Sequence, residues 1–214
     1  MKEINKNIIM EKNRIFTVSE YNKSVYGEKI RNYSGKYLRE WNPKRSKLAA
    51  AIIKGLKEIP LNKNTNVLYL GASTGTTVSH ISDICYNGRI FAVEFAYDPF
   101  VKLYNLAKIR SNIFPILDDA NMPEKYRFFV DKINFIYQDI AQRNQVDIFN
   151  KNADLFTCAK YAMLILKLKS ISSRKNERFI LNNAIRNIKN FKIMEIIDLR
   201  PFDSGNFLLS MVRH

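Results

Sequence analysis

The sequence has few of the residues that mark disulfide-bonded, zinc-binding or membrane-spanning proteins. Its 214 residues include two cysteines, Cys85 and Cys158, which stand far apart with no second cysteine or nearby histidine beside either. This spacing excludes a typical zinc site, and in a reducing compartment we expect neither a disulfide nor a bound metal. No apolar run approaches the ~18 residues that cross a bilayer, and the opening stretch MKEINKNIIMEKN lacks the apolar core of a signal peptide. We therefore expect a soluble, intracellular protein with no membrane partner.

Acidic residues are scarce relative to basic ones. The chain has 20 Asp and Glu against 35 Lys and Arg, a formal net charge of +15, and a sequence pI near 9.8. A charge of this size favours a polyanionic partner. A genome biased toward Lys, Asn and Ile produces the same excess, so charge by itself leaves nucleic acid, a membrane surface and compositional bias open.

Glycine and proline are also few, 7 and 6, and no low-complexity segment concentrates them. The length suits one α/β domain with a small appendage. Residues 1–40 are polar with β-prone pieces, RIFTV and KSVYG, and predict a small β-rich amino-terminal module. Residues 41–214 form the expected main domain. It opens with WNPKRSKLAAAIIKGLKEIP at 41–60, which predicts a helix with Asn42 as N-cap and Pro43 at the first helical position.

Short apolar runs alternate with helix-length segments through the rest of the chain. The runs are NVLYLG, RIFAVEF, NIFPIL, INFIYQD, AMLILKLK, FKIMEIIDL and NFLLSMV. Because they are apolar on both faces and are separated by helices, they predict a mostly parallel sheet covered on both sides. The expected fold class is α/β, with a seven-stranded sheet.

The turn after the first of these strands carries the main chemical signal. In VLYLGASTGTTVSH, at 67–80, Gly71 ends the strand, Gly75 follows, and TTVSHISDI continues as a helix. Glycines let a backbone approach a ligand closely, and a helix N-terminus offers unpaired N–H groups and a positive dipole end. A glycine turn by itself is more often an ordinary connection between a strand and a helix.

Carboxylates at the ends of later strands strengthen the ligand interpretation. Glu94 ends the second strand, roughly twenty residues on, where a carboxylate can accept hydrogen bonds from two ribose hydroxyls. Asp118 and Asp119 follow the third strand, where they can meet the edge of an adenine, and Asp139 ends the fourth. The turn is neither G-x-G-x-x-G nor G-K-[ST], so a dinucleotide or a P-loop nucleotide fits poorly. S-adenosylmethionine fits better, with its methionine part along the backbone of residues 71–77.

Several stretches resemble fibrillarin, the methyltransferase family of box C/D ribonucleoprotein particles. They are VYGEK, REWNPKRSKLAAAI, VLYLGASTGTTVSHISDI, AVEF, NLAKIRSNIFPIL, DDA, KYR and DIAQ, within residues 24–145. The resemblance implies a Rossmann-like S-adenosylmethionine-dependent methyltransferase fold. It also implies guide-RNA-directed methyl transfer to a ribose 2'-hydroxyl of rRNA, in pre-rRNA modification and processing. The implied partners are the box C/D guide RNA, the rRNA substrate, a Nop-domain scaffold protein and a kink-turn-binding protein.

The resemblance further implies a Lys-Asp-Lys-His group in the active site. Lys47 matches the lysine of the family's RSKLAA, and Asp139 matches the aspartate of its D-[IV]-A-Q. Lys167 matches the lysine that ends the fifth strand, with Lys169 as its competitor because the strand entry TCAKYAM is shorter than usual. Asn206 stands where the family has its histidine, and asparagine does not titrate near neutral pH. On this view Lys167 is the base, or it stabilises the emerging alkoxide.

His80 and Trp41 are expected to have structural roles, and we expect no metal ligand. We interpret His80 as a structural helix residue. Trp41 is expected to pack between the amino-terminal module and the main domain, with stacking on RNA left open.

The expected cofactor-binding residues are Gly71, Ala72, Ser73, Gly75, Thr76, Thr77, Glu94, Phe95, Asp119, Ala120, Asp139 and Gln142.

Two other functions compete with guided RNA methylation. Asn206, and AQRNQ where the family has AQPDQ, support a catalytically weakened structural subunit of the same particle. A methyltransferase acting on protein, such as histone glutamine, or on a small molecule is the third hypothesis. The compartment depends on the source. The stretch REW favours an archaeal protein, for which we expect the cytoplasm. The stretch KYR favours a reduced eukaryotic protein, for which we expect the nucleolus.

Overall fold

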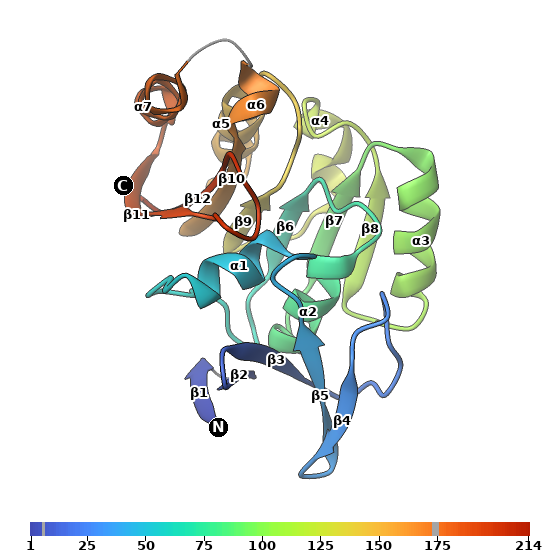
Figure 1. The fold of residues 1–214 in the computed structure, drawn as a ribbon. Coiled ribbons are helices and arrows are strands. Elements are labelled where there is room, and N and C mark those ends of the chain that lie inside the picture. Colours follow the sequence, from blue (N-terminus) through green and yellow to red (C-terminus); the bar gives the residue numbers. More distant parts are fainter. Residues whose placement is uncertain (6, 173–175) are drawn as a thin grey trace.

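A computed structural model describes residues 1–5, 7–172 and 176–214 as two β-sheets with helices packed on them (Figure 1). The amino-terminal sheet has the order β1-β2-β3-β5-β4, and all its neighbouring strands are antiparallel. The prediction of a β-rich amino-terminal module is confirmed, while the division into domains at residue 40 stays a prediction. The five strands are β1 (Lys2–Asn5), β2 (Ile8–Glu11), β3 (Arg14–Ser19), β4 (Ile30–Tyr33) and β5 (Lys36–Trp41).

The prediction of a strand at KSVYG is wrong, because this segment is a turn around a carboxylate. Glu28 Oε2 accepts hydrogen bonds from Ser24 Oγ at 2.8 Å and from the Tyr26 amide at 2.9 Å. The Val25 amide donates to both oxygens of the same carboxylate at 3.1 Å. The backbone amides that would donate hydrogen bonds to a neighbouring strand therefore donate to this carboxylate instead.

The main sheet has the strand order β11-β12-β10-β9-β6-β7-β8. The β10–β12 and β11–β12 pairings are antiparallel and the other four pairings of this sheet are parallel, so the sheet is mostly parallel. The prediction of an α/β fold with seven main strands is confirmed. These strands are β6 (Val67–Leu70), β7 (Ile90–Glu94), β8 (Ile113–Leu117), β9 (Phe135–Gln138), β10 (Tyr161–Lys167), β11 (Phe191–Asp198) and β12 (Asn206–Arg213).

Helices cover both faces of the main sheet, and the alternation of side chains along β6 shows the two faces (Figure 1). Val67 and Tyr69 pack in one core, and Leu68 and Leu70 pack in the other. The first core is shared with α1 (Lys47–Ile53), α2 (Thr76–Ile84) and α3 (Tyr97–Ala107). The second is shared with α4 (Pro123–Tyr126), α5 (Gln145–Leu155), α6 (Leu168–Ile171) and α7 (Glu177–Asn187), and a 3-10 turn, η1 (Arg127–Phe129), follows α4.

Helix α1 begins later than the sequence suggests, so the prediction of Asn42 as its N-cap is wrong. Ser46 is the N-cap, and its hydroxyl accepts a hydrogen bond from the Ala49 amide at 3.4 Å. The Asn42 side chain instead accepts from the Lys44 amide at 2.9 Å, which closes a short turn before the helix. The helix ends early because Gly55, at φ +95°, follows its C-cap.

His80 joins the two sheets as a buried, neutral ring. Its Nδ1 lies 2.8 Å from Thr17 Oγ1, its Nε2 lies 2.8 Å from Tyr26 Oη, and its ring stacks on Trp41 with centroids 4.9 Å apart. Burial lowers the pKa of His80 well below its usual value, and the nearby Arg39 guanidinium lowers it further. These contacts confirm the structural interpretation of His80 and of Trp41.

A chain of buried ion pairs crosses the same junction. Arg39 of β5 lies 2.5 Å from carboxylate oxygens of both Glu28 and Asp83, and all three side chains are buried. Arg110, beyond the end of α3, lies 2.7 Å from the other oxygen of Asp83. Removing one partner from such a network leaves a buried charge unpaired, which typically costs 3–5 kcal/mol.

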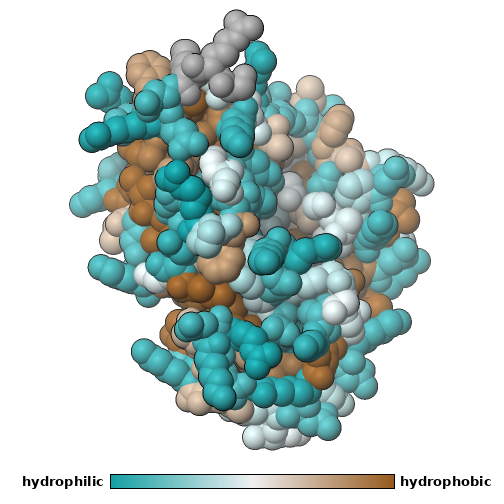
Figure 2. Space-filling view, in the orientation of Figure 1, coloured by the Kyte–Doolittle hydropathy of each residue, from teal (hydrophilic) through white to brown (hydrophobic). Residues whose placement is uncertain are grey.

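Hydrophilic residues dominate the face seen in Figure 2, with smaller hydrophobic patches among them. In the described ranges no helix has both the length and the apolar character needed to span a membrane.

Candidate active site

The glycine turn after β6 is fixed by contacts with two neighbouring strands. The amides of Gly71 and Ala72 both donate to the Val93 carbonyl of β7 at 3.0 Å. Gly71 has φ +80°, and a Cβ at this position would lie 2.8 Å from the Asp139 carbonyl oxygen after β9. Glycine is therefore required both for the backbone conformation and for the close approach of the two strand ends.

A cavity of about 260 Å³ opens along the carboxyl ends of the central strands. Most of the expected cofactor-binding residues line it, together with Val93, Asp118, Ile140, Ala141 and Lys167. A crevice at this edge of an open parallel sheet is the usual ligand site of the fold. The expected residues in its wall are Gly71, Ser73, Glu94, Phe95, Asp119, Ala120, Asp139 and Gln142.

The other four expected residues, Ala72, Gly75, Thr76 and Thr77, do not line this cavity. Ala72 is 4% exposed in the core, and a Cβ at Gly75 would lie 2.5 Å from Leu106 of α3. The Thr77 hydroxyl donates to Ser46 Oγ at 3.0 Å, away from the cavity wall. Gly75 and Thr77 thus seat the turn against α3 and the N-cap of α1, and Thr76 is the first residue of α2.

Two carboxylates present acceptor oxygens on the cavity wall. Glu94 Oε2 accepts from the Ser73 amide at 2.7 Å, and Oε1 accepts from the Ala96 amide at 2.8 Å. Asp119 Oδ1 accepts from the Asn121 amide at 2.8 Å. Each carboxylate oxygen has a further lone pair, so both groups are held in place while they remain able to accept hydrogen bonds from ligand hydroxyl or amino groups.

Asp139 lies between two lysine ammonium groups at the end of β9. Its Oδ2 is 3.0 Å from Lys47 Nζ of α1, and its Oδ1 is 2.7 Å from Lys167 Nζ at the end of β10. Lys167 Nζ is also 3.2 Å from the Asp139 carbonyl oxygen, to which its hydrogen bond is directed. The three side chains are 15–22% exposed, so they are shielded from bulk water and still reachable by a substrate. Among the described residues no cluster of His, Cys, Asp and Glu could hold a metal ion.

Lys167, and not its competitor Lys169, is the lysine in the cavity wall. Lys169 is exposed on α6. Buried Gln145 fixes the end of β10, because its Oε1 accepts from the Lys167 amide at 2.8 Å and its Nε2 lies 3.3 Å from the Lys167 carbonyl oxygen. Gln145 is the last residue of AQRNQ, and sequence reasoning did not single it out.

Asn206 reaches the lysine pair through a carboxylate that sequence reasoning missed. Its Nδ2 donates to Asp203 Oδ1 at 2.7 Å, and Asp203 Oδ2 lies 3.7 Å from Lys47 Nζ. Asp203 lies in the same FDSGNF stretch, three residues before Asn206. A carboxylate this near the substituted position was the signal in the sequence that could have identified it as a site residue. The loop thus brings a second negative charge to Lys47.

Comparison with known sequences identifies one family along nearly the whole chain. The sequence model of the family described as Fibrillarin matches residues 4–214. A "Fibrillarin-like rRNA/tRNA 2'-O-methyltransferase" of Picrophilus torridus is 60% identical over 213 residues, covering 100% of both chains. A relative of the same description from Thermoplasma acidophilum is 52% identical over 204 residues, covering 95% of this chain and 88% of the relative.

Solved structures give the same result. The Methanococcus jannaschii fibrillarin pre-rRNA processing protein superposes with a TM-score of 0.93 at 40% identity, covering 99% of this chain and 96% of the other. Aeropyrum pernix fibrillarin, solved with natively bound S-adenosyl-L-methionine, gives 0.85 at 39% identity, covering 93% and 89%. A fibrillarin/Nop5p complex gives 0.90 at 40% identity, covering 98% of each chain.

Proposed function

This chain belongs to the fibrillarin family, and we propose that it is the catalytic subunit of a box C/D ribonucleoprotein that methylates ribose 2'-hydroxyls of rRNA under the direction of a guide RNA. The observation that carries the proposal is the placement of Asp139 between Lys47 and Lys167, in the wall of a cavity that also holds Glu94 and Asp119. The names of the relatives also include tRNA, which makes tRNA a second substrate class.

The residues of this cavity suit S-adenosylmethionine, which supplies an electrophilic methyl group when it is bound. Glu94 and Asp119 offer fixed acceptor oxygens for the ribose hydroxyls and the adenine edge. Phe95, 70% exposed in the same wall, offers a ring face for the adenine. The natively bound cofactor of the Aeropyrum pernix protein supports this cofactor.

The lysine and aspartate side chains would then align and activate the RNA hydroxyl. Asp139 holds both ammonium groups within 3.0 Å of its carboxylate, which fixes their positions before substrate arrives. Lys167 stands where its ammonium group can stabilise the oxygen as negative charge develops, or where, as the neutral amine, it can accept the hydroxyl proton. Asn206 contributes through Asp203, which it holds near Lys47.

The proposed partners follow from the same family membership and from the charge. A Nop-domain scaffold protein is supported by the fibrillarin/Nop5p complex, and a kink-turn-binding protein would complete the particle. The net charge of +15 suits a guide RNA and an RNA substrate. The relatives compared above are archaeal, so we propose the cytoplasm as the compartment.

Methyl transfer in a reconstituted particle tests the proposal directly. The chain is assembled with guide RNA, scaffold and kink-turn-binding protein, supplied with labelled S-adenosylmethionine, and the modified nucleotide is mapped. A 2'-O-methyl that moves when the guide sequence is shifted is the expected result. Assembly and cofactor binding without transfer would instead favour a structural subunit, and transfer to protein without RNA would favour a protein methyltransferase.

A further inference from the structure

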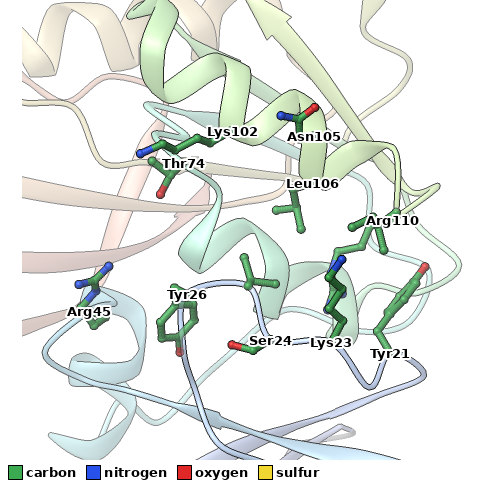
Figure 3. Close-up of a pocket in the computed structure, with 12 residues that line it drawn as sticks. Tyr21, Lys23, Ser24, Tyr26, Arg45, Thr74, Lys102, Asn105, Leu106 and Arg110 are labelled. Carbon is green, nitrogen blue, oxygen red and sulfur yellow. The ribbon is translucent and has the colours of Figure 1, made fainter.

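A second cavity lies on the other side of the glycine turn from the candidate active site. It encloses about 440 Å³, compared with about 260 Å³ for the first cavity, and the two share no lining residue. Ser73 lines the first cavity and its neighbour Thr74 lines the second, so one turn separates them. Figure 3 shows the second cavity between α3 and the loop that follows β3. Nothing in the proposed chemistry uses this space.

The walls of the second cavity are positively charged. Lys23, Arg45, Lys102 and Arg110 line it, and no Asp or Glu does. Figure 3 shows the first three around the space, contributed by separate parts of the chain. Within the described ranges Lys23, Arg45 and Lys102 form no ion pair. Three unpaired cations around one space favour an anionic ligand.

Arg110 adds a buried donor that lacks a partner. The residue is 1% exposed, its Nη1 lies 2.7 Å from Asp83 Oδ1, and its guanidinium lies 4.3 Å from the centroid of the Tyr21 ring. Its Nη2 is buried and has no hydrogen-bond partner among the described residues. A buried unsatisfied donor typically costs about 1–3 kcal/mol, so the positive charge of Arg110 beneath this wall is not fully compensated within the fold.

Most of the rest of the cavity wall is apolar and aromatic, and Ser24, Thr74 and Asn105 complete it. Val25, Leu106 and Ile109 line it, and Ile109 is 47% exposed. Tyr21 and Tyr26 also line it. A basic margin over an apolar, aromatic surface matches a nucleotide, whose phosphate is anionic and whose base has flat apolar faces. An acidic peptide would meet the cations and leave the apolar surface uncovered.

We propose that this second cavity binds one nucleotide of the RNA strand that leads to the methylated ribose. The phosphate lies among Lys23, Arg45 and Lys102, and the base lies against Val25, Leu106 and Ile109. Arg45 stands two residues before Lys47, whose ammonium contacts Asp139, so the two cavities are linked through the start of α1. The identity of the ligand as substrate RNA rests on the proposed function.

The test variant is Lys23→Ala/Lys102→Ala, in which both replaced side chains are exposed and form no ion pair with the part of the chain that the structure describes. The matched control is Lys63→Ala/Lys192→Ala. These lysines are also exposed, lie near the amino ends of β6 and β11, and line neither cavity. Both double variants remove two positive charges, so a general loss of charge affects them equally.

The first readout is the KM for target RNA in the assembled particle. The cavity variant should raise this KM about tenfold with kcat and cofactor affinity unchanged, while the KM of the control should stay within about twofold of the wild type.

The second readout is the affinity of the free chain for a labelled single-stranded RNA of about ten nucleotides at several salt concentrations. Loss of the one phosphate contact of this cavity should lower the magnitude of the slope of log affinity against log salt by about 0.7.

A second variant tests the apolar wall. Ile109→Glu places a carboxylate in the cavity and should weaken RNA binding at least as much as the double lysine variant. Ile109→Val keeps the apolar surface and should bind RNA as the wild type does. Equal RNA affinity for Ile109→Glu and Ile109→Val would overturn the proposal.

The outcomes separate this inference from the proposed function. If the particle methylates RNA and the cavity variant behaves as the control, the function stands and the second site is wrong. If the particle transfers no methyl group, the function fails, and equal RNA affinity of the free cavity and control variants would overturn the second site as well. A glutamate peptide of matched charge that binds the wild type as tightly as the RNA would assign the cavity to an acidic protein segment instead.

Discussion

Asn206 lies directly opposite Lys167 in the antiparallel pairing of β10 with β12. One residue of this pair contacts Asp139, and the other holds Asp203, which approaches Lys47. The position that departs from the family pattern is therefore part of the same hydrogen-bonded and ionic cluster as the two lysines.

Asp139→Ala should abolish methyl transfer and leave the fold intact. The substitution removes the carboxylate that both lysines contact, so we expect the rate at saturating cofactor to fall by at least about 100-fold. Asp147→Ala, at an exposed position on α5, is the matched control and should keep full activity. Circular dichroism and thermal melting check the fold, and full activity of Asp139→Ala would remove Asp139 from the catalytic group.

Asn206→His should raise the rate of transfer by roughly tenfold, because a histidine ring can keep the bond to Asp203 and adds a group that titrates near neutral pH. Its rate profile should gain a dependence on pH near the ordinary histidine pKa of about 6.5. Asn206→Ala should lower the rate, because it leaves Asp203 without that donor. An unchanged or slower Asn206→His enzyme would mean that the pocket has adapted to asparagine.

Gly71→Ala should destabilise the protein more than Gly55→Ala. Both glycines have positive φ, +80° and +95°, but a Cβ at Gly71 would lie 2.8 Å from the Asp139 carbonyl, while a Cβ at Gly55 meets nothing within 4 Å. The conformational cost alone is about 1–2 kcal/mol, and we expect roughly 2–4 kcal/mol in total for Gly71→Ala. Urea unfolding measures the difference; equal losses would show that the backbone absorbs the clash.

Stability should fall with acid through the titration of Glu28. Burial opposes the ionisation of Glu28, but hydrogen bonds from the Tyr26 and Val25 amides and the Arg39 guanidinium outweigh it and lower the pKa of Glu28 from 4.5 to about 2. Because the folded pKa is the lower one, the stabilisation is present above about pH 4.5 and is lost as the pH falls toward 2. The loss should be on the order of 2–3 kcal/mol.

Glu28→Gln isolates this contribution. The variant should be less stable at neutral pH and should lose less stability than the wild type between pH 4.5 and about 2. Glu58→Gln, at an exposed position, should follow the wild-type curve. Identical pH dependence of Glu28→Gln and wild type, measured by urea unfolding, would exclude Glu28 as the source.

The sequence predicts the main sheet and one edge of the site because both follow from local patterns. Runs that are apolar on both faces specify buried parallel strands, and polar residues after such runs, such as Glu94 and Asp139, must meet at the carboxyl edge. The start of α1 was harder to predict, because Asn42 and Ser46 both have side chains that cap helices and only the tertiary structure decides between them.

Long-range contacts explain what the sequence did not reveal. Asp203 joins the lysines only because the loop before β12 folds back toward α1, and no local pattern encodes that distance. The amino-terminal turn at 23–27 has β-prone residues, but the Glu28 carboxylate accepts the backbone hydrogen bonds that a strand would donate to its neighbour. Tertiary contacts override local propensity at both places.

The buried charges between the sheets also determine how the chain unfolds. Arg39 belongs to one sheet and Asp83 to a helix of the other, and neither is exposed to water at all. Opening the boundary between the sheets would break these ion pairs and expose Ile15 and Trp41 of the core that the two sheets share, so the two sheets should melt in a single cooperative transition. Two units that are separable by eye in Figure 1 are therefore one thermodynamic unit, and a fragment beginning after β5 would lack a complementary half of its own interior.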